Sequence, residues 1–258
     1  MRNIKVTLEY DGTHYLGWQR QPQGMTIQQA MEEALEKILG VRTRVTGASR
    51  TDAGVHARGQ SANFQVESDL TPERLRGALN ALLPRDIVVV ESREVPPEFD
   101  SRFSALSKLY HYTIWNRSVR PAMFRQFMWH FRWELDLERM RAATPALLGR
   151  HDFAAFESAN AQSETTVRTI TRAEWMGNGS QLIFAIEADA FLYNMVRAIV
   201  GTLTDVGRGK IAPEAMPGII AGANRANAGR TAPPQGLCLM EVRYDLPELP
   251  SATATEEQ

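Results

Sequence analysis

Residues 47–57 read Gly47-Ala48-Ser49-Arg50-Thr51-Asp52-Ala53-Gly54-Val55-His56-Ala57 and lie between two apolar, strand-like runs. An ordinary turn needs a glycine or two and a few short polar residues. This segment also carries a carboxylate, Asp52, and a guanidinium, Arg50, while Gly47 and Gly54 let the backbone approach another group closely. A solvated loop with a local ion pair is the common interpretation of such a segment, so the rest of the chain must decide whether it is more.

The residues before and after this loop predict six secondary-structure elements. A strand at residues 4–10 alternates apolar and polar residues, and Thr26 opens a helix that ends at Gly40. Strands are expected at about 41–47 and at 61–67, on either side of the loop. Thr71-Pro72 begins a second helix, which Pro84 stops before a strand at 87–90.

The resulting order, β-α-β-β-α-β, is typical of the ferredoxin-like arrangement. An antiparallel sheet of this kind carries both helices on one face. Its other face is therefore expected to be free to bind a ligand.

The pattern breaks near residue 100, where we place a domain boundary. Beyond it, strands are expected at about 108–115, 126–133, 166–175 and 181–189, with Gly177-Asn178-Gly179-Ser180 as the turn between the last two. Asp136 is expected to open a helix that stops or kinks near Pro145. A long helix at about 191–205, a shorter one after Pro213 and a strand at 237–244 complete the chain.

The second half therefore repeats the architecture of the first without repeating its sequence. We predict an N-terminal half at residues 1–100, which carries the Asp52 loop, and a C-terminal half at 101–245. Residues 246–258 are expected to form a disordered tail, since they hold few apolar residues to pack.

Composition limits the function classes. The chain has 258 residues, 43% of them hydrophobic, and a net charge of −1, which argues against a protein that coats nucleic acid through excess positive charge. Arginines nevertheless cluster at 42–58, 117–125 and 197–208. Because no segment resembles a signal peptide or a membrane span, we expect a soluble, cytoplasmic protein.

Five segments of the chain resemble one enzyme family, the TruA family of tRNA pseudouridine synthases. The match runs from the first strand to about residue 244. The segments are Tyr10-Asp11-Gly12-Thr13 with Gly17-Trp18-Gln19; Arg50 to Ala57; Leu79-Asn80-Ala81-Leu82-Leu83-Pro84-Arg85-Asp86-Ile87; Arg102-Phe103-Ser104-Ala105 with Tyr110; and Asn194-Met195-Val196-Arg197 with Ile199-Val200-Gly201. The resemblance implies an α+β fold in which two ferredoxin-like halves with antiparallel sheets form a pseudo-twofold core around a central cleft.

The resemblance also implies an activity and its catalytic residues. The family isomerises uridine to pseudouridine at tRNA positions 38, 39 and 40, and its essential aspartate corresponds to Asp52. A carboxylate can add to the base or the sugar, or assist loss of the C2′ proton, and can then leave again. Because burial favours the protonated acid, a guanidinium is needed to keep the carboxylate charged, and the resemblance assigns that role to Arg197.

Further site residues follow from the same resemblance. Tyr110 is expected to stack on the detached uracil, since a phenol is a poor base at neutral pH. The target uridine must be flipped out of its stem or loop. Arg50 is the candidate for holding the displaced backbone through a phosphate, with His56 and Arg58 as further RNA contacts. Trp18 is expected either to stack on RNA or to pack in the core.

Partners and cofactors are implied as well. The resemblance implies a tRNA partner and a homodimer, and an isomerisation requires no cofactor and no metal. One departure from the family pattern is Phe99-Asp100-Ser101, where many members have Phe-His-Ala.

Two other functions share some of these sequence features. The order β-α-β-β-α-β is also that of the RNA recognition motif, a non-catalytic RNA-binding module. Its aromatic signature is met only at the start of Arg58-Gly59-Gln60-Ser61-Ala62-Asn63-Phe64. A metal-dependent hydrolase would need clustered ligands, whereas the five histidines are scattered along the chain, at His14, His56, His111, His130 and His151.

Overall fold

A computed structural model describes residues 1–158, 164–177 and 179–246. The predicted disordered tail therefore lies outside the described residues, apart from Leu246. Asn178 in the predicted turn at 177–180 also lies outside them. Across the described segments, no helix is both long and apolar enough to span a membrane.

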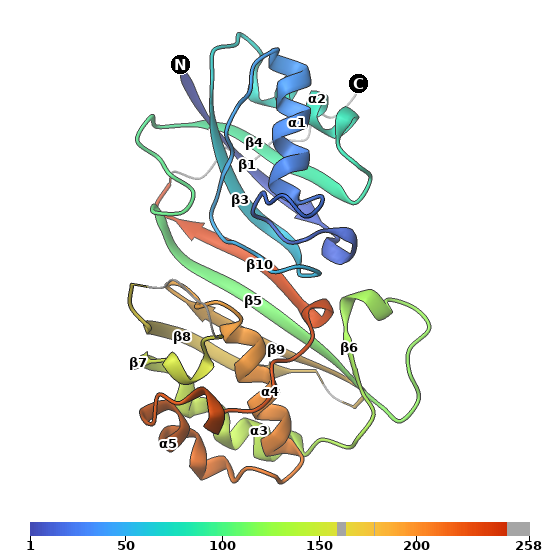
Figure 1. Cartoon of the computed structure of the whole chain (residues 1–258), viewed down its shortest axis with the longest axis vertical. Coiled ribbons are helices and arrows are strands. Elements are labelled where there is room, and N and C mark those ends of the chain that lie inside the picture. The colour runs from blue at the N-terminus through green and yellow to red at the C-terminus, as the bar shows by residue number, and fades with distance from the viewer. Residues whose placement is uncertain (159–163, 178, 247–258) are drawn as a thin grey trace, which may run out of the picture.

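The described residues form one α+β structure around a single, mostly antiparallel sheet of ten strands (Figure 1). Eight strands follow the order β4-β1-β3-β10-β5-β9-β8-β7, while β2 pairs with β3 and β6 pairs with β5. The strands are β1 (Arg2–Tyr10), β2 (Thr46–Gly47), β3 (His56–Val66), β4 (Ile87–Val95), β5 (Ala105–Asn116), β6 (Trp129–Phe131), β7 (Gly149–Asp152), β8 (Val167–Met176), β9 (Gln181–Ala188) and β10 (Leu237–Tyr244).

The N-terminal elements follow the predicted order, with two differences in length. Helices α1 (Ile27–Leu39) and α2 (Pro72–Leu82) begin where expected, because the hydroxyls of Thr26 and Thr71 cap their first turns. The strand expected at 41–47 is reduced to the two residues of β2, and β3 starts at His56 rather than at residue 61. Consequently the Asp52 loop leads directly into the longest strand of this half.

The last strand joins the two parts of the sheet. Strand β10 runs parallel to β3, with Leu239 opposite Ala57, and antiparallel to β5, with Leu239 opposite Tyr110. The expectation of separate sheets in the two halves is therefore wrong, because residues 237–244 form backbone hydrogen bonds with both. This bridge fixes the Asp52 loop, which precedes β3, relative to Tyr110 on β5.

The C-terminal helices differ from the predictions at their ends. Helix α3 (Leu137–Ala143) is capped by Asp136 and gives way to a 3-10 turn that contains Pro145, as expected. Helix α4 (Met195–Gly207) starts four residues later than predicted, because Asn194 before it adopts a left-handed backbone with φ 61°. The strand predicted at 126–133 is shorter in the structure, where a 3-10 turn precedes the three residues of β6. A second 3-10 turn precedes the helix α5 (Met216–Ala221).

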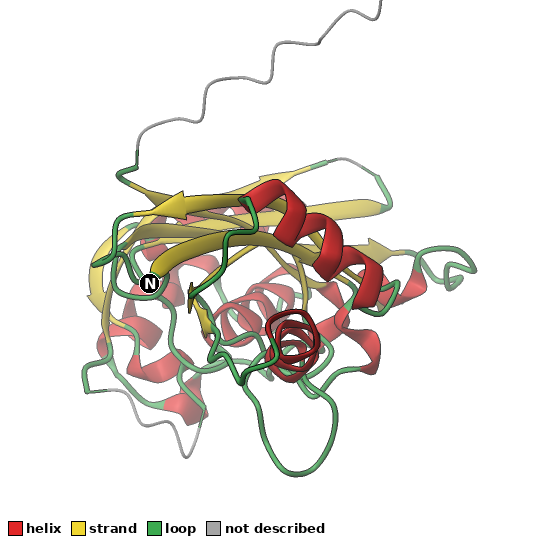
Figure 2. Ribbon diagram, turned by 90° about the horizontal axis from the view of Figure 1, so that it is seen from above, coloured by secondary structure: helices red, strands yellow, loops and turns green. Residues whose placement is uncertain are grey.

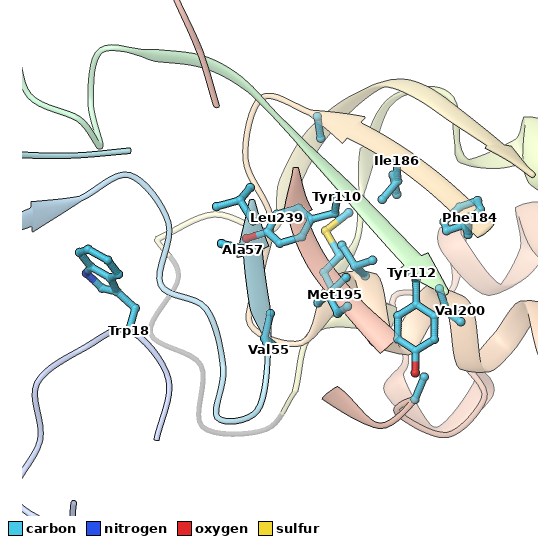
Figure 3. Close-up of a cluster of buried hydrophobic side chains, with 14 of the residues drawn as sticks. Trp18, Val55, Ala57, Tyr110, Tyr112, Phe184, Ile186, Met195, Val200 and Leu239 are labelled. Carbon is cyan, nitrogen blue, oxygen red and sulfur yellow. The ribbon is translucent and has the colours of Figure 1, made fainter. Parts of the chain in front are cut away.

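The helices gather on one side of the sheet (Figure 2), with α1 and α4 in front of it in the view of Figure 1. Eleven residues of α4 are buried, so this helix lies inside the C-terminal core and holds its first turn in a fixed place. The side chains beneath α4 include Tyr110, Tyr112 and Phe184 (Figure 3). The site described next lies on this helix-bearing side.

Candidate active site

The backbone of the Asp52 loop is fixed from both sides. The Trp18 N–H donates to the Thr51 carbonyl at 3.0 Å, and the Val55 N–H donates to the Asp52 carbonyl at 3.1 Å. Gly17 has φ 83°, and a Cβ at this position would lie 2.4 Å from the Thr51 oxygen. Glycine is thus required at residue 17 for the segment before α1 to support the loop.

A buried hydrogen-bond network fixes the neighbours of Asp52. The hydroxyls of Thr51 and Tyr10 lie 2.8 Å apart, and the Gln60 amide donates to the Ser49 carbonyl at 2.6 Å. The Ser49 N–H in turn donates to the Gln60 side-chain oxygen at 3.2 Å. These bonds hold Ser49 and Thr51 in place on the N-terminal side of Asp52.

Asp52 faces Arg197, which lies in the first turn of α4. Arg197 Nη1 donates to Asp52 Oδ2 at 2.9 Å, and each side chain is 15% exposed. Arg197 Nε donates to the Ala232 carbonyl at 2.7 Å, and Nη1 also donates to Asn194 Oδ1. The guanidinium is therefore held by three acceptors, while the carboxylate keeps some access to solvent.

The charge state of Asp52 reflects two opposing effects. Burial raises the pKa of the Asp52 carboxyl, and the hydrogen bond and charge of Arg197 act against that rise. Burial is the larger effect, so the pKa stays above its ordinary value. A carboxylate with a raised pKa is more basic than a free one, and the Arg197 charge favours its ionised form.

Tyr110 lies on the strand next to β10, on the same side of the sheet. Its hydroxyl is 2.8 Å from Ser49 Oγ, and its ring makes an edge contact with Phe191 at a centroid distance of 5.2 Å. Figure 3 shows the ring beside Leu239 and Ala57. Burial and the nearby Asp52 charge raise the pKa of Tyr110. The phenol is thus a weaker acid than usual, so the phenolate that could accept a proton is scarcer at neutral pH.

His56 does not occupy the RNA-contacting position that the sequence predicted. It is 3% exposed, its Nδ1 accepts from the Gly12 N–H at 3.0 Å, and its Nε2 lies 2.8 Å from the Gln126 carbonyl. Since both ring nitrogens are engaged, His56 joins three segments of the protein and is not available to RNA. Burial lowers the pKa of His56, against an opposing effect of the nearby Asp11.

The two predicted arginine contacts differ in position. Arg50 is exposed next to the Asp52 turn. Arg58 adjoins Ala57, which shares the face of Tyr110, so the alternation of β3 directs Arg58 to the opposite face. There its Nε lies 4.0 Å from Glu9. Arg58 therefore lies on the face opposite to Tyr110, whereas Arg50 is an exposed residue of the loop that carries Asp52.

Trp18 is 1% exposed, so of its two predicted roles the core role is correct. Three contributors to the site were not singled out from the sequence: Ser49, Asn194 and the Ala232 carbonyl. The first two lie inside quoted motifs, but only the folded chain shows that they touch Tyr110 and Arg197. The carbonyl of Ala232 gives no sequence signal, because any residue carries one.

The comparisons with known proteins cover most of the chain. The family model described as tRNA pseudouridine synthase matches residues 7–104 and 143–245. A tRNA pseudouridine synthase A from Geotalea daltonii is 48% identical over 244 residues, covering 95% of this chain and 100% of that protein. The tRNA pseudouridine synthase A 2 of Clostridium perfringens is 47% identical over 244 residues, with the same two coverages.

The likeness to solved structures is weaker. A chain in the crystal structure of the archaeal box H/ACA sRNP Nop10-Cbf5 complex matches with a TM-score of 0.37 and 11% identity. That match covers 78% of this chain and 44% of the other.

Proposed function

The chain belongs to the tRNA pseudouridine synthase family and isomerises uridine to pseudouridine in tRNA, and we propose that Asp52 is the residue that performs this reaction. The pairing of Asp52 with Arg197 carries this proposal. The carboxylate is ionisable, partly accessible and hydrogen-bonded to a partly buried guanidinium. These are the properties that a covalent or basic catalyst needs.

The reaction breaks the N1–C1′ bond of uridine and forms a C5–C1′ bond. C5 loses its proton and N1 gains one, so no electrons are gained or lost overall. Asp52 either adds to the base or the sugar or assists loss of the C2′ proton, and each route requires the ionised carboxylate. Arg197 keeps that form populated and also stabilises negative charge that returns to the carboxylate when it leaves.

Tyr110 holds the detached uracil by stacking. Its ring is fixed by Ser49 and Phe191, and the raised pKa of its hydroxyl argues against a proton-accepting role. The uridine enters by base flipping, and Arg50 holds the displaced backbone through a phosphate. The substrate position is in the anticodon stem-loop, at tRNA positions 38, 39 and 40, as the family resemblance implies.

The domain organisation fits a site built from two halves. Asp52 comes from residues 1–100, whereas Tyr110 and Arg197 come from 101–245, so the reacting uridine lies in a cleft between a ferredoxin-like N-terminal half and its C-terminal counterpart. The strand order β4-β1-β3 with β2 on β3 supports this description of the first half. A homodimer in the cytoplasm is proposed on the family resemblance alone.

Tritium release from C5-labelled uridine in a tRNA anticodon stem-loop tests the proposal, because every pseudouridine formed gives up that label. We expect release by the wild type in the presence of a chelator, and a loss of at least about 10³-fold for Asp52→Asn with folding and RNA binding unchanged. Asp69→Asn, which changes an exposed carboxylate, is the matched control. Wild-type rates for Asp52→Asn would contradict the assignment.

A further inference from the structure

The loop that connects β5 to β6 has an unusual composition. Residues 117–127, here called the arginine–aromatic loop, read Arg117-Ser118-Val119-Arg120-Pro121-Ala122-Met123-Phe124-Arg125-Gln126-Phe127. In Figure 1 the loop, in light green, projects at the right edge of the molecule, beside β6. None of the three proposed catalytic residues, Asp52, Tyr110 and Arg197, lies in this loop.

The loop presents large apolar side chains to solvent. Val119 is 72% exposed, Met123 71% and Phe124 61%. Phe124 also has a left-handed backbone, with φ 55° and ψ 19°, a conformation that is costly for a bulky residue. Strain of this kind is retained mainly where the surrounding structure enforces it for a function. The loop therefore holds an exposed aromatic ring in a costly conformation.

Contacts with His56 fix the base of the arginine–aromatic loop against the Asp52 loop. The Gln126 carbonyl accepts from His56, whose ring packs on Phe127 at a centroid distance of 4.8 Å. A groove of about 380 Å³ lies beside it. The groove is lined by Thr13, Gly54, Arg125, Gln126, Pro234 and Gln235. Since Gly54 is two residues from Asp52, RNA whose uridine reaches Asp52 must pass close to this groove.

The charge of this region favours RNA over a protein partner. Residues 101–133 contain six arginines and lysines and no aspartate or glutamate, although the whole chain has a net charge of −1. Two copies of the chain that met through this loop would bring like charges together, which is unfavourable. A polyanion would instead pair with the arginines, while unpaired bases stack on the aromatic ring.

We propose that the arginine–aromatic loop is an RNA-binding element that contacts unpaired nucleotides next to the flipped uridine. Phe124 stacks on a base, and Arg120 and Arg125 pair with phosphates. The inference rests on the proposed function, since it takes the substrate to be the anticodon stem-loop. In this proposal His56 is a positioning residue, because its contacts with Gln126 and Phe127 hold the arginine–aromatic loop beside Asp52.

Two sets of variants separate stacking from charge. Phe124→Gly removes the ring and relieves the left-handed backbone, so it is expected to keep the thermal midpoint and to weaken binding of a fluorescent anticodon stem-loop roughly 5- to 150-fold. Phe124→Tyr is expected to restore binding. Arg120→Gln with Arg125→Gln is expected to reduce the slope of log Kd against log salt by about 0.7 to 0.9 for each lost phosphate contact. Phe124→Gly is expected to leave that slope unchanged.

Matched controls lie away from the loop. Val41→Gly removes another exposed apolar side chain, 62% exposed, and Arg74→Gln removes an exposed arginine from α2. Both are expected to bind RNA like the wild type. Sedimentation of each variant reports whether the loop joins two copies of the chain.

The inference is overturned if Phe124→Gly and the double arginine variant bind RNA like the wild type, or if they change the oligomeric state and leave RNA affinity unaltered. Tritium release by the wild type separates this failure from a failure of the proposed function. If the wild type is active and the loop variants bind RNA as well as it does, only this inference is contradicted and the proposed function stands. A wild type that neither binds nor converts the stem-loop would contradict both.

Discussion

Arg197 donates to Asp52 at 2.9 Å across 145 residues of sequence. Asp52 lies in the loop before β3 and Arg197 in the helix α4 of the C-terminal half. The strand β10, the last of the chain, is hydrogen-bonded to both β3 and β5 and so joins the two halves. The contact therefore forms only when the C-terminal strand is in place. The active site therefore depends on completion of the sheet.

Replacement of Arg197 is expected to change the pH dependence of the reaction. Burial raises the pKa of Asp52 and Arg197 opposes that rise, so Arg197→Ala is expected to raise the pKa further and to move the acid limb of the pH–rate profile to higher pH. At neutral pH we expect kcat to fall roughly 10²-fold. An unchanged acid limb would argue against this role. Arg208→Ala, at the exposed end of the same helix, is the control.

The two roles considered for Tyr110 are separated by a pair of variants. Tyr110→Phe keeps the ring and loses the hydrogen bond to Ser49, so it is expected to cost about 1 kcal/mol of unfolding free energy and to lower kcat less than about tenfold. Tyr110→Ala removes the stacking surface and is expected to lose far more activity. Single-turnover rates measure both. A Phe variant as inactive as the Ala variant would show that the hydroxyl is essential.

Gly201 in α4 is expected to tolerate no side chain. A Cβ at this position would lie 1.6 Å from the Arg230 carbonyl, and residues 230–232 supply the Ala232 carbonyl that holds Arg197. Gly201→Ala should therefore lower the unfolding free energy by about 1–3 kcal/mol and also reduce kcat. In urea unfolding, the matched control Gly77→Ala should raise the unfolding free energy by about 0.5–1 kcal/mol. At Gly77, in α2, a Cβ meets nothing within 4 Å.

His56 is expected to make part of the stability depend on pH. Its pKa is lowered in the folded protein, so the unfolded chain takes up the proton first as the pH falls. The stability that neutral His56 contributes is fully present above the ordinary histidine pKa of 6.5. It is lost as the pH falls through the lowered pKa of His56 in the folded protein. Urea unfolding from about pH 5 to about pH 8 should show this loss for the wild type.

Variants identify the histidine that is responsible. His56→Gln should reduce the pH dependence and also lower the unfolding free energy by about 1–3 kcal/mol, since the Gly12 N–H or the Gln126 carbonyl loses its partner. His14→Gln, which changes an exposed histidine, should leave both unchanged. Equal pH dependence in wild type and His56→Gln would assign the effect to another group.

Much of the fold could be predicted because its signals are local. Thr26, Thr71 and Asp136 cap helices where they were expected to, since a cap depends on a few neighbouring residues. The predicted start of α4 is too early, because the apolar run at 191–193 resembles a helix turn while Asn194 adopts a left-handed backbone. The single sheet was also missed, since the pairing of β10 with β3 leaves no local signal.

Residue types and short spacings were enough to predict most of the elements, the family and three residues expected to act together, Asp52, Tyr110 and Arg197. Other features emerge only in the folded chain. They are the burial of His56, the position of Arg58 on the face opposite to Tyr110, and the contacts of Arg197 with Asn194 and the Ala232 carbonyl. These facts depend on which strands pair and on which face each side chain emerges. Both are set by hydrogen bonds and packing between residues far apart in the chain.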